Sequence, residues 1–102
     1  MLKGNNALIT GSKQGIGRSI AIKLASQGCN IGVNDIVKDE FTHETIDILQ
    51  KYEVNVSWHK ADISSKAETD KMIDNFIEEC EKEAAKLEIT VDYYIAEFVV
   101  NV

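Results

Sequence analysis

The chain has 102 residues, which allows one domain of modest size, and its apolar fraction of 44% and charged fraction of 27% are ordinary for a globular protein. The formal net charge of −6 disfavours binding to nucleic acid or to an anionic membrane surface, because both are negatively charged. No apolar run approaches the roughly 18 residues of a membrane span. The start, Met1-Leu2-Lys3-Gly4, opens no signal-peptide apolar region, so we expect a cytoplasmic protein.

Neither the cysteines nor the histidines mark a site of their own. Cys29 and Cys80 match no metal or redox spacing, and both fall in apolar surroundings, so we expect two buried thiols in a reducing compartment. His43 and His59 lack partners at ligand or catalytic spacing, and we expect one on an exposed helix face and the other at a strand end. The sequence therefore predicts no metal site.

The first third of the chain predicts a strand, a turn, a helix and a second strand. Ala7–Thr10 is a continuous apolar run, typical of a strand that is buried on both faces. After a glycine-rich turn, apolar residues recur at helical spacing until Gly28, and glycine is the residue that most often ends a helix. Ile31–Val33 predicts the second strand, which ends at Asn34 and Asp35.

The rest of the chain continues the alternation. Phe41–Tyr52 predicts a second helix, and Val54–Trp58 a third strand that runs toward Asp62, with Trp58 in the core. Ser65 and the glutamate three residues later form a capping box that opens a long third helix. A fourth strand is expected from about Val91 to Ile95. One face of the second helix is expected to carry Thr45, Ile48, Leu49 and Tyr52.

Strands that alternate with helices at this spacing form βαβ units, and therefore a parallel sheet with right-handed crossovers. The predicted fold class is α/β, the N-terminal part of a doubly wound parallel sheet (Rossmann-like), with about four strands and three helices. We place a dinucleotide-binding half-domain at residues 1–95 and an atypical tail at residues 96–102.

The turn after the first strand carries three glycines, Gly11, Gly15 and Gly17. Glycines at this spacing let the backbone turn tightly and approach a phosphate without an intervening side chain. The N-terminus of the following helix adds partial positive charge, so a pyrophosphate there would meet the N–H groups of residues 12–16.

Two of the expected strands end on a carboxylate. Asp35 lies 18 residues after Gly17, where a carboxylate can accept hydrogen bonds from both ribose hydroxyls and would repel a 2′-phosphate. Asp62 ends the third strand. The alternative for both is an ordinary helix-capping or loop carboxylate.

The pattern Thr-Gly-x-x-x-Gly-x-Gly over residues 10–17 resembles the short-chain dehydrogenase/reductase family, and residues 6–11 and 15–18 resemble its 3-oxoacyl-carrier-protein reductase branch. Asp62-Ile63-Ser64 is similar to the motif that ends the third strand of that family. The resemblance covers about residues 1–95. It implies that Asp62 meets the adenine amino group of a dinucleotide and that Ile63 flanks the ring.

The resemblance also bears on the choice of cofactor. NADP-binding members commonly place Arg or Lys just before the second glycine or just after the second strand, where this sequence has Gln14 and Ile36. Lys13 lies one place off, and we expect it to be a solvated surface lysine. NAD is therefore favoured over NADP. The expected cofactor-binding residues are Gly11, Ser12, Gln14, Gly15, Ile16, Gly17, Asp35, Ile36, Asp62 and Ile63.

The sequence departs from the family at its catalytic residues. Val91–Val99 contains no Asn-Asn-Ala-Gly turn, and neither the family's serine nor its Tyr-x-x-x-Lys pair follows, so no catalytic residue is predicted. The resemblance implies an NAD(P)-dependent oxidoreductase that transfers hydride between the cofactor and a ketone or secondary alcohol, with only the cofactor-binding half in this chain.

Two alternatives stay open at this point. The fourth strand would present an open edge, so we expect a homo-oligomer or association through that edge. A non-catalytic dinucleotide-binding or oligomerisation module would use this edge to pair with a partner. A methyltransferase-type Rossmann domain would also carry an acid after the second strand, but its glycines are usually closer together.

Overall fold

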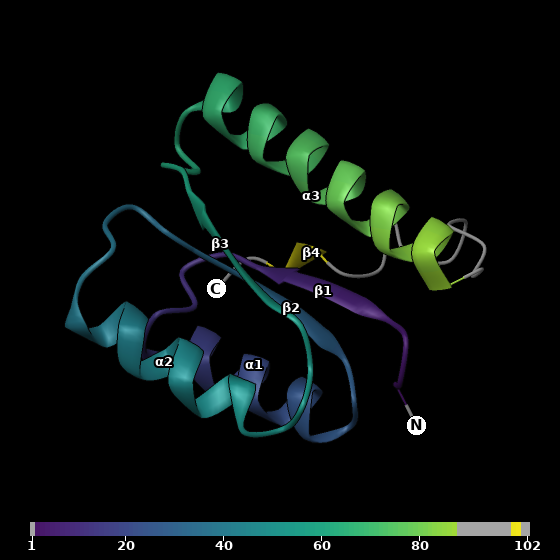
Figure 1. Ribbon diagram of the computed structural model, residues 1–102. Helices are drawn as coiled ribbons and strands as arrows, with labels where there is room; N and C mark the ends of the chain where they lie inside the picture. The colour runs from purple at the N-terminus through teal and green to yellow at the C-terminus, as the bar shows by residue number, and fades with distance from the viewer. Residues whose placement is uncertain (1, 88–98, 101–102) are drawn as a thin grey trace.

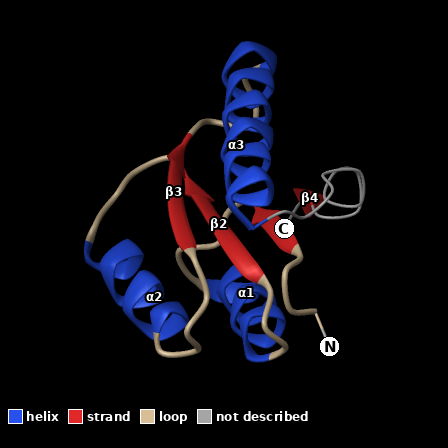
Figure 2. Cartoon of the chain, turned by 45° about the vertical axis from the view of Figure 1, so that its right-hand side comes forward, coloured by secondary structure: helices blue, strands red, loops and turns tan. Residues whose placement is uncertain are grey.

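The structure, a computed structural model, describes residues 2–87 and 99–100 of the chain (Figure 1). Its strands form one parallel sheet in the order β3-β2-β1-β4. Helices α1 and α2 lie on one face of the sheet and α3 lies on the other (Figures 1 and 2). The elements are β1 (Asn6–Ile9), α1 (Gly15–Ser26), β2 (Asn30–Asp35), α2 (Glu40–Gln50), β3 (Val56–Lys60), α3 (Lys66–Leu87) and β4 (Val99–Val100). The predicted α/β class is confirmed.

The two central strands are buried, as their apolar runs predict. Every residue of β1 is buried, and so are the four inner residues of β2. Successive side chains of a strand point to opposite faces, which divides the core into two clusters. The cluster beneath α1 and α2 comprises Ala7, Ile9, Ala21, Ala25, Cys29, Ile31, Val33 and Leu49. The cluster beneath α3 comprises Leu8, Ala61, Met72, Phe76 and Cys80.

Helix α1 ends where the sequence predicts. Gly28 follows the C-cap residue Gln27 and has a φ of +91°, a left-handed conformation that would be strained for a residue with a side chain. The burial of Cys29 and Cys80, both free thiols, is also confirmed. Trp58 is half-buried and packs against the cluster beneath α1 and α2, in agreement with its expected place in the core.

Helix α2 begins one residue earlier than expected and ends two residues earlier. The Asp39 carboxylate accepts hydrogen bonds from the N–H groups of Phe41 and Thr42, and the Thr42 hydroxyl accepts one from the Asp39 N–H. This capping box sets the start of the helix. The expected place of Tyr52 on one helix face with Thr45 and Leu49 is wrong, because α2 ends before it and its side chain is 42% exposed. Thr42 is buried with Thr45 and Leu49 instead.

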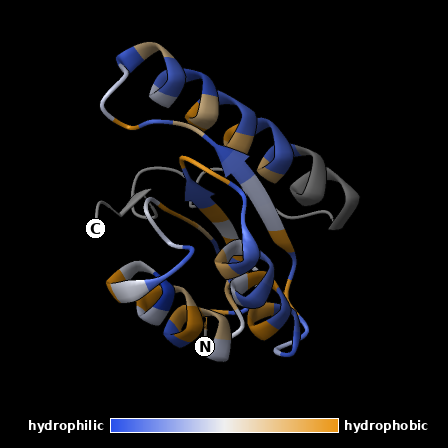
Figure 3. Ribbon diagram, turned by 90° about the vertical axis from the view of Figure 1, so that its left-hand side faces the viewer, coloured by the Kyte–Doolittle hydropathy of each residue, from blue (hydrophilic) through white to orange (hydrophobic). Residues whose placement is uncertain are grey.

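Helix α3 starts at the predicted cap, although its capping box is only half formed. The N–H of Glu68 donates to the Ser65 hydroxyl at 3.3 Å, but the Glu68 carboxylate accepts from the N–H of Asp62 instead of Ser65. Met72, Phe76 and Cys80 form its buried stripe, while its outer face is polar (Figure 3).

The strand next to β1 differs from the expected one. Val99 and Val100 pair in parallel with Leu8 and Ile9, so β4 lies within the segment that we expected to be an atypical tail. The expected strand at residues 91–95 lies outside the described residues, and the domain boundary at residue 95 stays a prediction.

Candidate functional site

The carboxyl ends of β1, β2 and β3 meet at one edge of the sheet, because all three strands are parallel neighbours. The glycine turn follows β1, Asp35 ends β2, and Asp62 comes two residues after β3. In open α/β sheets, ligands bind in the crevice outside this edge. The structure therefore brings the predicted site residues to the place where a ligand is expected.

The three glycines of the turn have different structural roles. Gly11 and Gly15 have φ angles of +62° and +64°, which favour glycine. A Cβ on Gly17 would lie 2.5 Å from the carbonyl oxygen of Gly11 and 2.8 Å from the Cα of Ser12, so only glycine lets α1 pack this closely on the turn. Apart from the two chain neighbours of Gly15 and the nearby backbone of its own helix, no atom of the described residues lies within 4 Å of a Cβ position on Gly15, which leaves open space at the helix start.

The N-terminus of α1 is open to an anion. Gln14 precedes the helix in an extended conformation, and among the described residues no side chain caps the helix and no acidic residue lies in its first turn. An α-helix leaves the N–H groups of its first turn without helical partners. Ile16, in that turn, is 72% exposed. These N–H groups and the helix dipole form an anion-binding surface beside the space at Gly15.

A buried asparagine, which the sequence analysis did not single out, joins the three strand ends. The Asn34 side chain accepts a hydrogen bond from the N–H of Gly11 at 3.3 Å and donates to the carbonyls of His59 and Ala61 at 3.0 and 3.2 Å. Its backbone carbonyl accepts from the N–H of Ser12 at 2.9 Å. Asn34 is 1% exposed, so these bonds fix the glycine turn relative to β2 and β3. A polar amide near the end of a fully buried strand was the signal that could have revealed it.

Ser12 is directed into the protein. It is fully buried, its hydroxyl donates to the carbonyl of Ile9 at 2.7 Å, and the same hydroxyl accepts from the N–H of Asn34. Its own N–H is bonded to the Asn34 carbonyl. Ser12 therefore stabilises the conformation of the turn.

Asp35 lies beside the glycine turn. One carboxylate oxygen accepts from the N–H of Lys13 at 3.4 Å, and the other accepts from the N–H of Ile36 at 3.0 Å. Ile36 and Val37, which follow it, are 55% and 51% exposed. The half-buried carboxylate can accept a hydrogen bond from a sugar hydroxyl, while the exposed apolar side chains beside it can pack against a flat ring.

Asp62 is held in a tight turn. The N–H and the hydroxyl of Ser64 both donate to the same oxygen, Oδ1, at 2.9 and 2.7 Å. These bonds, the one from the hydroxyl first, lower the pKa of the Asp62 carboxyl. The Oδ1 oxygen of Asp62 thus stabilises the loop, and Ile63 beside it is 44% exposed.

Lys13 contradicts the expectation of a solvated surface lysine. Its side chain is only 15% exposed, and its ammonium lies 2.8 Å from a carboxylate oxygen of Asp39. The hydrogen bond to Asp39 raises the pKa of Lys13, and the charge of Asp35 adds to this effect. The sequence could not show the pairing, because the two residues are 26 positions apart.

Arg18 is a second residue that the sequence analysis left without a role. Its guanidinium donates twice to the backbone carbonyl of Lys13 in the glycine turn, at 3.2 and 3.0 Å. In α2 it donates to the Thr45 hydroxyl at 2.7 Å and to the Phe41 carbonyl at 3.3 Å, and it pairs with Glu44 at 2.8 Å. Arg18 therefore ties the glycine turn to α2.

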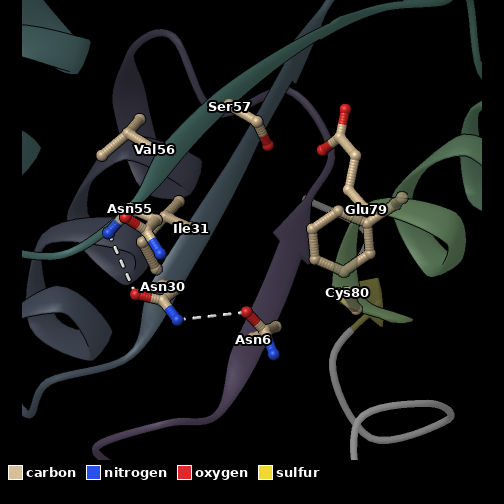
Figure 4. A pocket seen from close by; sticks show the side chains of 9 residues that line it. Asn6, Asn30, Ile31, Asn55, Val56, Ser57, Glu79 and Cys80 are labelled. Atoms are coloured by element: carbon tan, nitrogen blue, oxygen red, sulfur yellow. Dashed lines mark hydrogen bonds between the residues drawn. The ribbon is translucent and has the colours of Figure 1, made fainter. Parts of the chain in front are cut away.

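A separate cavity of about 160 Å³ lies at the opposite, amino-terminal ends of the strands, beneath α3 (Figure 4). The Asn30 side chain in its lining donates to the Asn6 side chain at 3.2 Å and accepts from the backbone N–H of Asn55 at 2.9 Å. These bonds join the starts of β1, β2 and β3, and we assign this end of the sheet a structural role.

His59 is buried next to that cavity and also has a structural role. The Ser57 hydroxyl lies 2.7 Å and the Glu79 carboxylate 3.6 Å from the same ring nitrogen, Nε2, so the three cannot relay a proton from one ring nitrogen to the other. Burial lowers the pKa of His59, and Glu79 opposes this effect. Within the described part of the chain, no group of metal-binding side chains occurs, and no helix is long and apolar enough to cross a membrane.

Comparison with known proteins agrees with this arrangement. Residues 5–91 match the short chain dehydrogenase family. The chain belongs to this family. It is 40% identical over 76 residues to an L-rhamnose 1-dehydrogenase (NADP(+)) of Thermoplasma acidophilum, covering 74% of this chain and 30% of the relative. It is 42% identical over 78 residues to a D-beta-hydroxybutyrate dehydrogenase of Cupriavidus necator, covering 72% and 28%.

Solved structures show the same fold. An NADH-dependent reductase, A1-R′, complexed with NAD matches with a TM-score of 0.72 and 34% identity, covering 78% of this chain and 33% of the reductase. This short-chain dehydrogenase chain thus spans about a third of the length of the relatives that it matches, and it corresponds to their N-terminal part.

Proposed function

We propose that this chain forms the cofactor-binding half of an NAD(P)-dependent oxidoreductase that transfers hydride between a nicotinamide cofactor and a ketone or secondary alcohol. The observation that carries the proposal is the uncapped N-terminus of α1, which opens on free space beside Gly15 and has Asp35 at its side. Helix N-termini of this kind bind pyrophosphate. The family to which the chain belongs supplies the reaction class.

Each predicted site residue receives a role in this proposal. The N–H groups of residues 14–17 bind the pyrophosphate, while Ser12 and Gly11 shape the turn that presents them. Asp35 accepts hydrogen bonds from the adenosine ribose. Ile36 and Ile63, both more than 40% exposed, flank the adenine ring, and the second oxygen of Asp62 accepts from the adenine amino group.

The proposed cofactor is NAD in preference to NADP. If Asp35 binds the adenosine ribose, the 2′-phosphate of NADP would lie next to this carboxylate, which would repel it. The relatives include both kinds, since A1-R′ is named as NADH-dependent and the rhamnose dehydrogenase as NADP-dependent. The preference must therefore be argued from residues of this chain.

The proposal includes association with another chain. The 102 residues contain no Tyr-x-x-x-Lys pair, so proton transfer to a carbonyl would depend on residues supplied from elsewhere. Within the described sheet, β3 and β4 are the edge strands, and an edge strand favours association with another chain. We include a homo-oligomer or an edge-strand complex in the cytoplasm in the proposal. The alternative is a non-catalytic dinucleotide-binding or oligomerisation module.

Calorimetric titration with NAD, NADP and ADP, together with a measurement of molecular size, tests this proposal. We expect saturable binding of NAD and ADP, with NADP weaker. Asp35→Asn should lower the affinity for NAD about tenfold, as expected for loss of a charged acceptor. Asp47→Asn, the same change at an exposed position of α2, should leave the affinity unchanged. Absence of NAD binding to the wild-type chain would contradict the proposal, and carbonyl turnover by the pure chain would exclude the non-catalytic alternative.

A further inference from the structure

We propose that the Lys13–Asp39 ion pair is a second determinant of nucleotide preference: Asp39 holds the lysine of the glycine turn away from a ribose 2′-phosphate, and its removal turns the site toward NADP. This inference deepens the proposed function and rests on it. It concerns residues outside the two positions at which the family's cofactor choice is usually expected.

Lys13 is close to the place where a 2′-phosphate would lie. Its backbone N–H donates at 3.4 Å to Asp35, the carboxylate proposed to bind the adenosine ribose. The negative charge of Asp35 also acts on the Lys13 ammonium. The ammonium is bonded to Asp39, while the backbone of the same residue is bonded to Asp35, so a nucleotide phosphate near Asp35 would compete with Asp39 for the ammonium.

Asp39 is firmly anchored in its present position. One carboxylate oxygen, Oδ1, accepts from the N–H groups of Phe41 and Thr42 at the start of α2, at 3.1 and 3.3 Å. The other oxygen, Oδ2, binds the Lys13 ammonium at 2.8 Å. Asp39 thus occupies a small anion site made by a helix N-terminus and a lysine.

The pair remains ionised at neutral pH. The hydrogen bond between them raises the pKa of Lys13 and lowers that of Asp39. While Asp39 pairs with the Lys13 ammonium, a 2′-phosphate meets the negative charge of Asp35 without a free cation to offset it. Once Asp39 is replaced, the lysine keeps its positive charge but loses this partner, and a 2′-phosphate can then take the place of the Asp39 carboxylate.

Two variants release Lys13 without removing the cap of α2. Asp39→Asn and Asp39→Ser keep a side-chain oxygen for the N–H groups of Phe41 and Thr42, since Asn and Ser are good capping residues. Neither supplies a negative charge to Lys13. Glu40→Gln is the matched control, because it removes the same charge from the adjacent, exposed residue of α2. Lys13→Gln in the wild-type and Asp39→Asn backgrounds shows whether the lysine is responsible.

The experiment is titration of each folded variant with NAD and NADP, and with adenosine 5′-monophosphate and adenosine 2′,5′-bisphosphate, which differ only in the 2′-phosphate. We expect both Asp39 variants to raise the affinity ratio of NADP to NAD about tenfold, as for one charge-assisted contact. Adding Lys13→Gln to Asp39→Asn should return the ratio to that of the wild type. Glu40→Gln, and Lys13→Gln alone, should each change the ratio less than about twofold.

The outcomes separate this inference from the proposed function. If the wild-type chain does not bind NAD, the proposed function fails and the inference fails with it. If the wild type binds NAD but the Asp39 variants leave the ratio unchanged, only the inference is overturned. It is also overturned if the rise in the NADP to NAD ratio persists in the Asp39→Asn, Lys13→Gln double variant, or if Glu40→Gln produces the same rise. Lys13→Gln must also weaken NADP binding less in the wild type than in the Asp39→Asn background, and an equal loss in both overturns the inference.

Discussion

The close contact between the start of α1 and the glycine turn makes Gly17→Ala the most informative single substitution. The added methyl carbon would lie 2.5 Å from the carbonyl oxygen of Gly11 and 2.8 Å from the Cα of Ser12. Both are backbone atoms, so no side-chain rotation relieves the clash, and the turn must move away from the helix. Overpacking of this kind costs about 1–3 kcal/mol. The higher helix propensity of alanine offsets at most about 1 kcal/mol.

We therefore expect Gly17→Ala to lower the free energy of unfolding in urea by about 1–2 kcal/mol. Because the turn presents the N–H groups of the anion site, the affinity for NAD should fall at least about tenfold, which corresponds to 1.4 kcal/mol. Urea unfolding and calorimetry on the same preparations measure both quantities.

Gly28→Ala is the control matched for stability. Gly28 lies at the other end of α1 with a φ of +91°, so alanine there is strained, and its Cβ would lie 3.2 Å from the backbone of Lys3. Left-handed alanine costs roughly 1–2 kcal/mol. This variant should lose stability to a similar extent but keep NAD affinity within about twofold. The reasoning is refuted if Gly17→Ala binds NAD normally, or if Gly28→Ala loses as much affinity as Gly17→Ala.

Three further predictions concern buried groups. Burial lowers the pKa of His59, so the folded chain favours the neutral imidazole. The free energy of unfolding should fall as the pH drops below about 6.5, where the unfolded chain begins to bind the proton. His59→Gln should flatten this pH dependence in urea titrations between pH 5 and 7.5. Asn34→Ala should lower the free energy of unfolding by about 2–3 kcal/mol, because the Gly11 N–H and two carbonyls lose their partner, whereas an equal effect from Asn75→Ala on the exposed face of α3 would contradict this. Burial raises the pKa of both the Cys29 and the Cys80 thiol to about 11, so both should react with iodoacetamide at pH 8 far more slowly in the folded chain than in urea; fast reaction of either thiol in the folded chain would refute its burial.

The periodic features of the sequence predicted the fold well. Ala7–Thr10 is apolar at every position but the last, which requires burial on both faces, and a parallel strand between helices supplies it. Gly28 predicted the end of α1, and Ser65 predicted the start of α3, because each acts on its own neighbours. Local patterns are sufficient where the interaction is local.

The misses depend on contacts between residues far apart in the chain. Lys13 looks like a surface lysine in the sequence, and only the fold brings Asp39 to within 2.8 Å of it. In the sequence, Asn34 is only a polar residue near the end of a strand, yet its side-chain amide forms hydrogen bonds that connect the ends of β1, β2 and β3. The end of α2 was missed for a simpler reason: Tyr52 fits the helical apolar period, but Glu53 takes a φ of +60° and the chain turns away.

Binding of a dinucleotide at the carboxyl edge of the sheet, across the start of α1, can be followed by a two-dimensional amide NMR titration of the ¹⁵N-labelled chain with NAD. We expect the N–H signals of Gly11, Gly15, Ile16, Gly17 and Asp35 to shift together and saturate. The signals of Asn30 and Asn55 at the opposite edge should stay in place. Shifts centred on the cavity beneath α3, or no shifts at the glycine turn at saturating NAD, would contradict it.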